Sequence, residues 1–313
     1  MAQLEKQTLI WCIDPSQEEN PPINVIHAIS ALTKNIPTEI IPTYVLSPDT
    51  INWFEKLADS WIDQFLPWAK KRCTEYLKNI ELKGLKQPQI LVNPTHSVRG
   101  DVDKIIEYSK QVNATSLVVS THARKGLHHF VIGSFAETLL IKTRIPVISI
   151  NPDTSSVEEI KNILFPTDFS ISSKEALLKL LPFAQKWNAQ IHIVHKTLNP
   201  VAPIVESGIL TLGGGWANTD AYIQSLNERA KDELAHLQEI CESRGVKSHA
   251  EIAGPEGDLI AEINKLALQK CADMIALNSE ANSFTATVVG SACREMIRQG
   301  NIPIWVHHIE IRK

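Results

Sequence analysis

One stretch of the chain occurs twice, and this repeat restricts the fold more than any other feature. GDVDKIIEYSKQVNATSLVVS begins at Gly100 and GDLIAEINKLALQKCADMIAL begins at Gly257, an offset of 157 residues. The same offset relates two further pairs of dipeptides: Gly133-Ser134 with Gly290-Ser291, and Ile145-Pro146 with Ile302-Pro303. Because these identities fall at turns and element ends in constant register, they indicate duplication of one structural unit.

The N-terminal parts of the two copies align at an offset of 154 residues, which places residues 9–16 on residues 163–170. An insertion or deletion therefore separates these parts from the longer repeat. The polar, proline-containing stretch 151–156 is the natural linker between the copies. With 313 residues and roughly 150 residues per domain, we predict two domains, residues 1–151 and 157–313.

Short apolar runs alternate with longer helical patterns in both copies. The runs predict strands near residues 9–13, 39–45, 89–93, 116–120 and 146–150, and near 162–167, 190–196, 247–253, 273–277 and 303–308. Helical periodicity predicts helices near 22–35, 53–80, 101–112 and 133–142, and near 173–187, 219–244, 257–270 and 290–299. Runs such as SLVVS at 116–120 are apolar without alternation, which is typical of a parallel strand buried on both faces. We therefore predict an α/β fold of two tandem, doubly wound, five-stranded parallel-sheet domains.

Composition and charge narrow the function classes. A net charge of −4 lacks the basic footprint that nucleic acids or anionic membranes require, so we expect neither as a partner. The N-terminus does not resemble a signal peptide, and no window approaches the ~20 apolar residues of a membrane span. The five cysteines are scattered and form no CxxC pair, which argues against a disulfide framework or a zinc site and favours the cytoplasm.

Ligands of doubly wound sheets bind at the carboxyl ends of the strands, where the strand order reverses. The residues that follow the first and fourth predicted strands are therefore candidates. They are Asp14 and Ser120 in the first copy, and Asp168 and Leu277 in the second.

The second copy opens with ILFPTDFS at residues 163–170, and the first copy closes with SLVVSTHARKGLHHFVIGSFAETLLIKTRIPVISI at residues 116–150. Together these segments resemble the universal stress protein family, and the resemblance covers nearly the whole chain as two domains. It implies a Rossmann-like fold of the adenine-nucleotide alpha-hydrolase-like type. It also implies ATP or AMP as a ligand, with Mg²⁺ accompanying ATP.

Nucleotide-binding members of this family carry G-x2-G-x9-G-[S/T] in the loop after strand 4. The matching positions are Ser120, Ala123, Gly133 and Ser134 in the first copy, and Leu277, Glu280, Gly290 and Ser291 in the second. Glycines let backbone N–H groups approach phosphate, and the small residues of the first copy preserve part of that property. Arg124 adds positive charge to the first loop, whereas Glu280 places a carboxylate where phosphate would lie. We therefore expect binding in the first domain and a degenerate second site.

The resemblance also assigns roles outside the loop. The aspartate after strand 1, Asp14 or Asp168, would contact the nucleoside, and the end of strand 2, near Val45 or Lys196, would line the base pocket. Simpler interpretations stay open: Asp14 is also a common turn residue, and Ser134 can serve as a helix cap.

Other features suggest no chemistry of their own. The pairs His128-His129 and His307-His308 chelate metals poorly, because adjacent residues of a strand point to opposite faces. The glycine-rich connection near 200–218 lacks the lysine of a P-loop, and it is interpreted as a mobile connection before the next helix, a lid or a contact surface. Trp53, Trp61 and Trp68 fit packing better than a cofactor box. No catalytic constellation appears.

The predicted function is a cytoplasmic, non-catalytic stress-response or signalling module with ATP or AMP in the first domain. The alternatives are a nucleotide-independent scaffold that acts through an unknown protein partner, and a weak ATPase. We also expect the two domains to pack as a pseudo-twofold pair through their last strands, because exposed sheet edges invite pairing and dimers in the family commonly pair there. The sequence leaves a homo-oligomer open.

Overall fold

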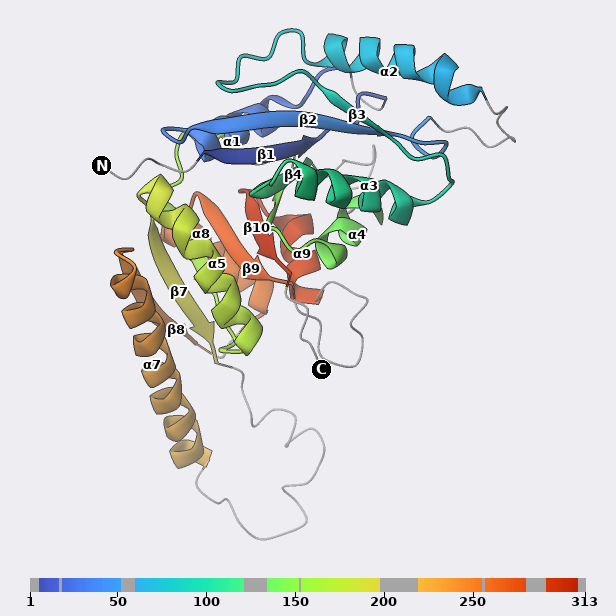
Figure 1. Cartoon of the computed structure of the whole chain (residues 1–313). Helices are drawn as coiled ribbons and strands as arrows, with labels where there is room; N and C mark the ends of the chain where they lie inside the picture. Colours follow the sequence, from blue (N-terminus) through green and yellow to red (C-terminus); the bar gives the residue numbers. More distant parts are fainter. Residues whose placement is uncertain are drawn as a thin grey trace, which may run out of the picture. The chain divides into compact units, whose positions relative to one another are not determined.

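The computed structural model describes residues 6–16, 19–51, 60–120, 134–151, 153–197, 219–254, 257–279 and 291–308. Its chain divides into two compact units. The first unit comprises Met1–Ile160 together with Leu277–Lys313, and the second comprises Lys161–Ala276. Each unit is an α/β structure (Figure 1).

The described residues of the first unit form the strands β1 (Gln7–Cys12), β2 (Thr38–Leu46), β3 (Gln89–Val92), β4 (Ser116–Ser120), β5 (Val147–Ile150) and β10 (Ile304–His307). They follow the order β3-β2-β1-β4-β5-β10. The pairs among β1 to β5 are parallel, and β10 runs antiparallel to β5. The helices are α1 (Ile23–Thr33), α2 (Trp61–Tyr76), α3 (Val98–Gln111), α4 (Ser134–Lys142) and α9 (Ser291–Gln299).

The second unit contains β6 (Asn162–Pro166), β7 (Gln190–Lys196) and β8 (Ser248–Ala253), and most of β9 (Met274–Asn278). These strands are parallel and follow the order β9-β6-β7-β8. The helices are α5 (Ile171–Trp187), α7 (Thr219–Ser243) and α8 (Leu259–Gln269). Figure 1 shows α7 running alongside β7 and β8, against which it packs.

Local sequence signals explain where several helices begin and end. Ser97 caps α3 by accepting a bond from the Gly100 amide, and Asp258 caps α8 by accepting two. Ser170 caps α5, which ends at Asn188 in the left-handed conformation that asparagine tolerates. Central strands such as β1, β4 and β6 are apolar in their interiors, and the largest buried side chains include Trp11, Tyr44, Phe165 and Trp305.

The α/β prediction is confirmed, and every predicted strand and helix has a counterpart at nearly the predicted residues. The α2 prediction, 53–80, extends into residues that lie outside the described part of the chain. Trp61 of this helix is buried and Trp68 is partly exposed, while Trp53 is also outside the described residues.

The pairing of the two last strands is symmetric in the repeat. The β5–β10 ladder places Ile148 opposite Trp305, and these positions are separated by the repeat offset of 157. On either side, Val147 pairs with Val306 and Ser149 with Ile304. A local pseudo-twofold axis therefore passes between Ile148 and Trp305. The predicted contact between the last strands is present at this point.

Candidate functional site

The first unit has the strand arrangement of a doubly wound ligand site. From β1 the chain moves outward to β2 and β3, and it then returns to β4 on the other side of β1. The order therefore reverses between β1 and β4, which is the position at which such sheets bind ligands. Asp14 lies two residues beyond β1, and Ser120 is the last residue of β4. Both belong to the carboxyl edge at this reversal.

Asp14 holds a turn at this edge. Its Oδ1 accepts bonds from the backbone N of Ser16 at 3.1 Å and from the Ser16 hydroxyl at 2.5 Å. Asp168 repeats the arrangement with Ser170, at 3.0 Å and 2.6 Å. The turn interpretation of this aspartate therefore describes its contacts in both copies. The same contacts fix the position of a carboxylate at the end of the first strand of each copy.

The end of β2 is apolar in one copy and cationic in the other. The strand registers place Ile40 beside Leu9 and Ile191 beside Ile163, so Val45 corresponds to Lys196. Val45 is buried. The Lys196 ammonium donates to the Gly254 carbonyl at 3.2 Å. The end of this strand is therefore aliphatic in the first copy and carries a cation in the second.

The loops that the sequence predicts to bind phosphate lie largely outside the described residues. This applies to Ala123, Arg124 and Gly133 in the first copy, to Glu280 and Gly290 in the second, and to the pair His128-His129. Helix α4 begins directly after the first loop, and Ser134, its first residue, is exposed. Helix α9 begins at Ser291, and Leu277 is buried within β9. A helix N-terminus, which can receive an anion, thus follows each of the two loops.

A buried carboxylate that sequence reasoning did not identify lies beyond this edge. Asp101 is only 3% exposed. It accepts bonds from the Ser47 hydroxyl at 3.1 Å and from the Asn93 amide at 2.8 Å. Burial raises the pKa of Asp101, and the two bonds oppose that rise. The network links the loops after β2 and β3 to α3. It therefore fixes the chain that directly follows Val45, which we call the rim.

The second copy has an aromatic pair beside its aspartate. The rings of Phe169 and His195 stack with centroids 4.2 Å apart. His195 Nδ1 lies 2.9 Å from the Thr167 carbonyl oxygen, and Phe169 has a positive φ of 61°. The register makes His195 the counterpart of Tyr44, so the two copies differ here as well. No periodicity in the sequence identifies this pair.

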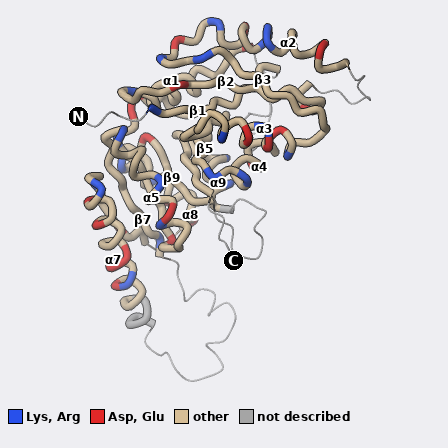
Figure 2. Tube along the Cα trace, viewed as in Figure 1, with Lys and Arg blue, Asp and Glu red and all other residues tan. Residues whose placement is uncertain are grey.

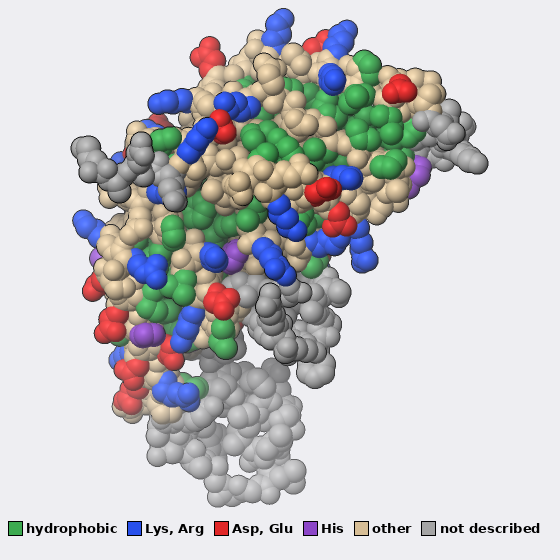
Figure 3. Space-filling model, in the orientation of Figure 1, with side chains coloured by type: hydrophobic (Ala, Val, Ile, Leu, Met, Phe, Trp, Pro, Cys, Tyr) green, Lys and Arg blue, Asp and Glu red, His purple; other side chains and the backbone are tan. Residues whose placement is uncertain are grey.

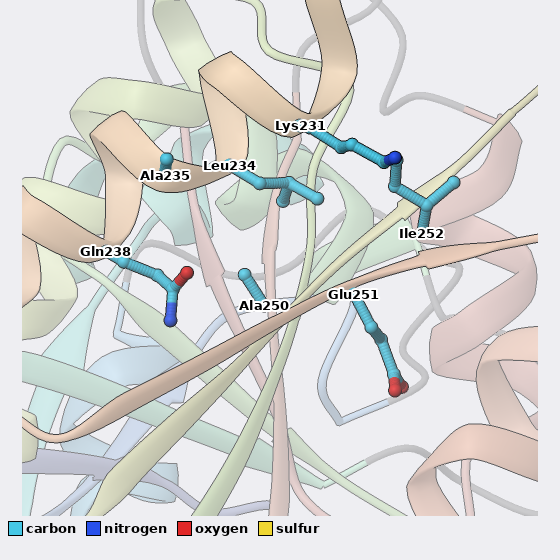
Figure 4. A pocket seen from close by; sticks show the side chains of 7 residues that line it. All are labelled: Lys231, Leu234, Ala235, Gln238, Ala250, Glu251 and Ile252. Carbon is cyan, nitrogen blue, oxygen red and sulfur yellow. The ribbon is translucent and has the colours of Figure 1, made fainter. Parts of the chain in front are cut away.

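A hollow of about 270 Å³ lies between α7 and β8 in the second unit. Figure 4 shows Leu234 of α7 pointing toward Ala250 of β8, with Lys231 and Gln238 along the helix. The Glu251 carboxylate points away from α7 and pairs with Lys270 at 2.7 Å. The lining of the hollow is mostly aliphatic and carries one lysine, so the hollow offers little to a polyphosphate.

Within the described ranges, no group of three or more His, Cys, Asp or Glu side chains is arranged to hold a metal ion. His307 is buried, and His308 Nδ1 lies 2.8 Å from the Ser279 hydroxyl. The same ranges contain no helix of the length and hydropathy needed to cross a membrane. Acidic and basic positions are mixed along α7 (Figure 2), and acidic and basic side chains are interspersed over the face in Figure 3.

Comparison with known proteins bears on the whole chain. The model of the universal stress protein family matches residues 7–151 and again residues 159–308. A universal stress protein of Methanocaldococcus jannaschii is 27% identical over 147 residues, which are 47% of this chain and 81% of that protein. A universal stress protein structure from Archaeoglobus fulgidus covers 96% of this chain and 98% of its own, with a TM-score of 0.64 and 19% identity. A structure from Pseudomonas aeruginosa UCBPP-PA14 aligns over 96% of this chain and 93% of its own, with a TM-score of 0.54 and 11% identity. At these identities the two structures support the fold alone.

Proposed function

The chain belongs to the universal stress protein family, as a tandem of two family domains, and from this premise we propose that its first domain binds ATP or AMP. The second domain would be a degenerate copy. The protein would then act in the cytoplasm as a stress-response or signalling module that reads nucleotide without turning it over. ATP would be accompanied by Mg²⁺.

One observation carries this proposal: in the first copy, residues that could bind a nucleotide surround the reversal of strand order between β1 and β4. Asp14 follows β1, Ser120 ends β4, and the N-terminus of α4 begins at the exposed Ser134. A carboxylate can accept bonds from ribose hydroxyls, and unpaired helix amides can donate bonds to phosphate oxygens.

The side chains at the corresponding positions of the second copy are less suitable. Leu277 replaces Ser120, and Glu280 replaces Ala123 in the loop. A carboxylate near phosphate repels it, and the repulsion grows as the cleft loses water. The resting position of Lys196 on the Gly254 carbonyl gives this copy a cation at the end of β7 instead of an apolar wall.

Calorimetry on the full chain tests the assignment. ATP and AMP would be titrated at one fixed salt and magnesium concentration into the native protein and into Gly133→Asp and Gly290→Asp variants. We expect Gly133→Asp to weaken binding at least tenfold, because it adds a negative side chain beside the phosphates. Gly290→Asp is the matched control at the equivalent position and should bind like the native protein.

Three other results would each redirect the assignment. Equal losses in the two variants, or a loss in Gly290→Asp alone, would contradict binding in the first domain. No measurable binding by the native chain would favour the scaffold that acts through protein contacts. Steady phosphate release from ATP, abolished by Gly133→Asp, would favour the weak ATPase.

A gain-of-function variant tests the physical reason. Ser120→Gly and Ala123→Gly together remove two side chains where the family pattern brings backbone close to phosphate. Each glycine also loosens the unfolded chain, so we expect a stability loss of about 0.5–1 kcal/mol per site. ATP affinity should nevertheless rise. A folded double variant whose affinity does not rise would show that these side chains do not limit binding.

A further inference from the structure

The contact between the two copies contains a charge pair with an unusual relation to the repeat. Glu137 of α4 and Arg294 of α9 form a salt bridge, with Oε1 and Nη2 2.7 Å apart. Residue 294 is residue 137 displaced by the repeat offset of 157. The same position of the duplicated unit thus meets itself across the pseudo-twofold axis that relates Ile148 to Trp305.

Twofold symmetry normally forces like to meet like at such a position. In an isologous contact, the residue at the axis faces its own copy. A contact between two first copies would bring two glutamates together here, and a contact between two second copies would bring two arginines together. Only the pairing of unlike copies gives an attractive contact.

The arginine is also at an unfavourable place in its own helix. Glu137 and Arg294 lie in the first turns of α4 and α9. The helix dipole favours an anion at an N-terminus and disfavours a cation. Glu137 therefore agrees with its helix, whereas Arg294 does not. Attraction to Glu137 accounts for an arginine at a position where the helix alone would favour an acid.

We propose that Glu137 and Arg294 make the α4–α9 and β5–β10 contact selective for two unlike copies of the repeat. The partner that this surface fits is the other copy within the same chain, and the like-charge contact between identical copies is rejected. This inference does not depend on whether either domain binds a nucleotide.

Charge reversal in the full chain tests the selectivity directly. Arg294→Glu places glutamates at both positions, and Glu137→Arg places arginines at both, so each variant recreates one like-with-like contact. The double variant restores opposite charges in the reverse order. Hydrogen exchange of the β5 and β10 amides reports how often this contact opens.

Glu137→Arg should speed exchange at residues 147–149 and 304–306 about three- to tenfold. The expected change is this small because both side chains of the pair are about one-third exposed, at 33% and 36%, and solvent therefore screens much of their interaction. Arg294→Glu should have a smaller effect, because the new glutamate suits the N-terminus of α9. The fold-increase in exchange rate of the double variant should be smaller than the product of the two single-variant increases. Its exchange rate should lie within about threefold of the native rate.

The control is a salt bridge that joins α4 to α3 within the first copy. Lys142 and Asp103 are 2.6 Å apart, and Lys142 is as exposed as the proposed pair. Its reversal, Lys142→Asp with Asp103→Lys, should leave exchange in β5 and β10 unchanged. The proposal fails if the effects of the two reversals at 137 and 294 simply multiply. It fails equally if single reversals leave exchange unaltered, or if the control variant changes it as much.

Discussion

Replacing Asn151 by alanine should destabilise the first unit more than its place in a polar linker suggests. The Asn151 side chain is 4% exposed, and its amide donates to the carbonyls of Ile297 at 3.0 Å and Gly300 at 2.6 Å. These carbonyls lie at the carboxyl end of α9, where helices leave acceptors without intrahelical partners. The residue therefore joins the end of β5 to the end of α9.

The magnitude follows from the two bonds. Each bond contributes about 0.5–1.5 kcal/mol net, and a buried acceptor left without a donor costs about 1–3 kcal/mol. The backbone contacts of Asn151 with Thr154, at 3.1 Å and 2.9 Å, do not need the amide and should survive. We therefore expect Asn151→Ala to cost about 2–3 kcal/mol, which lowers the melting temperature by roughly 5–10 °C.

Chemical denaturation of the full chain measures this cost. Asn301→Ala is the control, because Asn301 is exposed and only its backbone carbonyl bonds to the linker, at 2.8 Å from the Ser155 nitrogen. Surface substitutions of this kind usually change stability by less than about 0.5 kcal/mol. Asn151→Asp should be worse than alanine at neutral pH, since it faces two carbonyl oxygens with a charge. If Asn151→Ala costs no more than Asn301→Ala, water satisfies the carbonyls and the reasoning is wrong.

Three further outcomes are expected. A thiol reagent should label one cysteine per folded chain quickly, because Cys271 is exposed while burial raises the pKa of Cys12, Cys73 and Cys293 to about 12 and that of Cys241 to about 11; rapid labelling of a second site would contradict this. Burial, and then the charges of His249 and Lys270, lower the pKa of His192, so the unfolded chain takes up a proton first and stability should fall as pH drops below about 6.5. His192→Gln should make the denaturation midpoint depend less on pH between pH 7 and 5, and an unchanged pH dependence would contradict this role of His192. Asn188 adopts φ 54° at the end of α5, so Asn188→Ala should cost about 1 kcal/mol in thermal unfolding while Asn188→Gly stays near native.

The sheet could be predicted from the sequence because its signals are local. Buried parallel strands are continuous apolar runs, and the repeat supplied each assignment twice. The reversal between β1 and β4 then followed from the fold class, and it directed attention to Asp14 and Ser120. These inferences need only periodicity and register, which the chain carries residue by residue.

Contacts between distant segments carry no such signal. The stretch 151–156 has the polar, proline-containing composition of a linker, yet Asn151 and Thr154 are buried. The carbonyls that accept hydrogen bonds from the Asn151 amide lie at the end of α9, almost 150 residues later in the chain. The stacking of Phe169 on His195 likewise depends on a strand register and a positive φ that composition does not reveal.

Duplication shows how one position can acquire two structural roles. The repeated aspartate caps α8 as Asp258, but in the first copy Ser97 caps a helix that begins about one turn earlier. Asp101 is thereby released from capping and lies inside α3, where it binds Ser47 and Asn93. A residue retained in both copies thus stabilises a helix end in one and the rim beside the proposed base pocket in the other. Identity between the copies predicts that a position matters to the fold, whereas its contacts decide whether it also shapes a site.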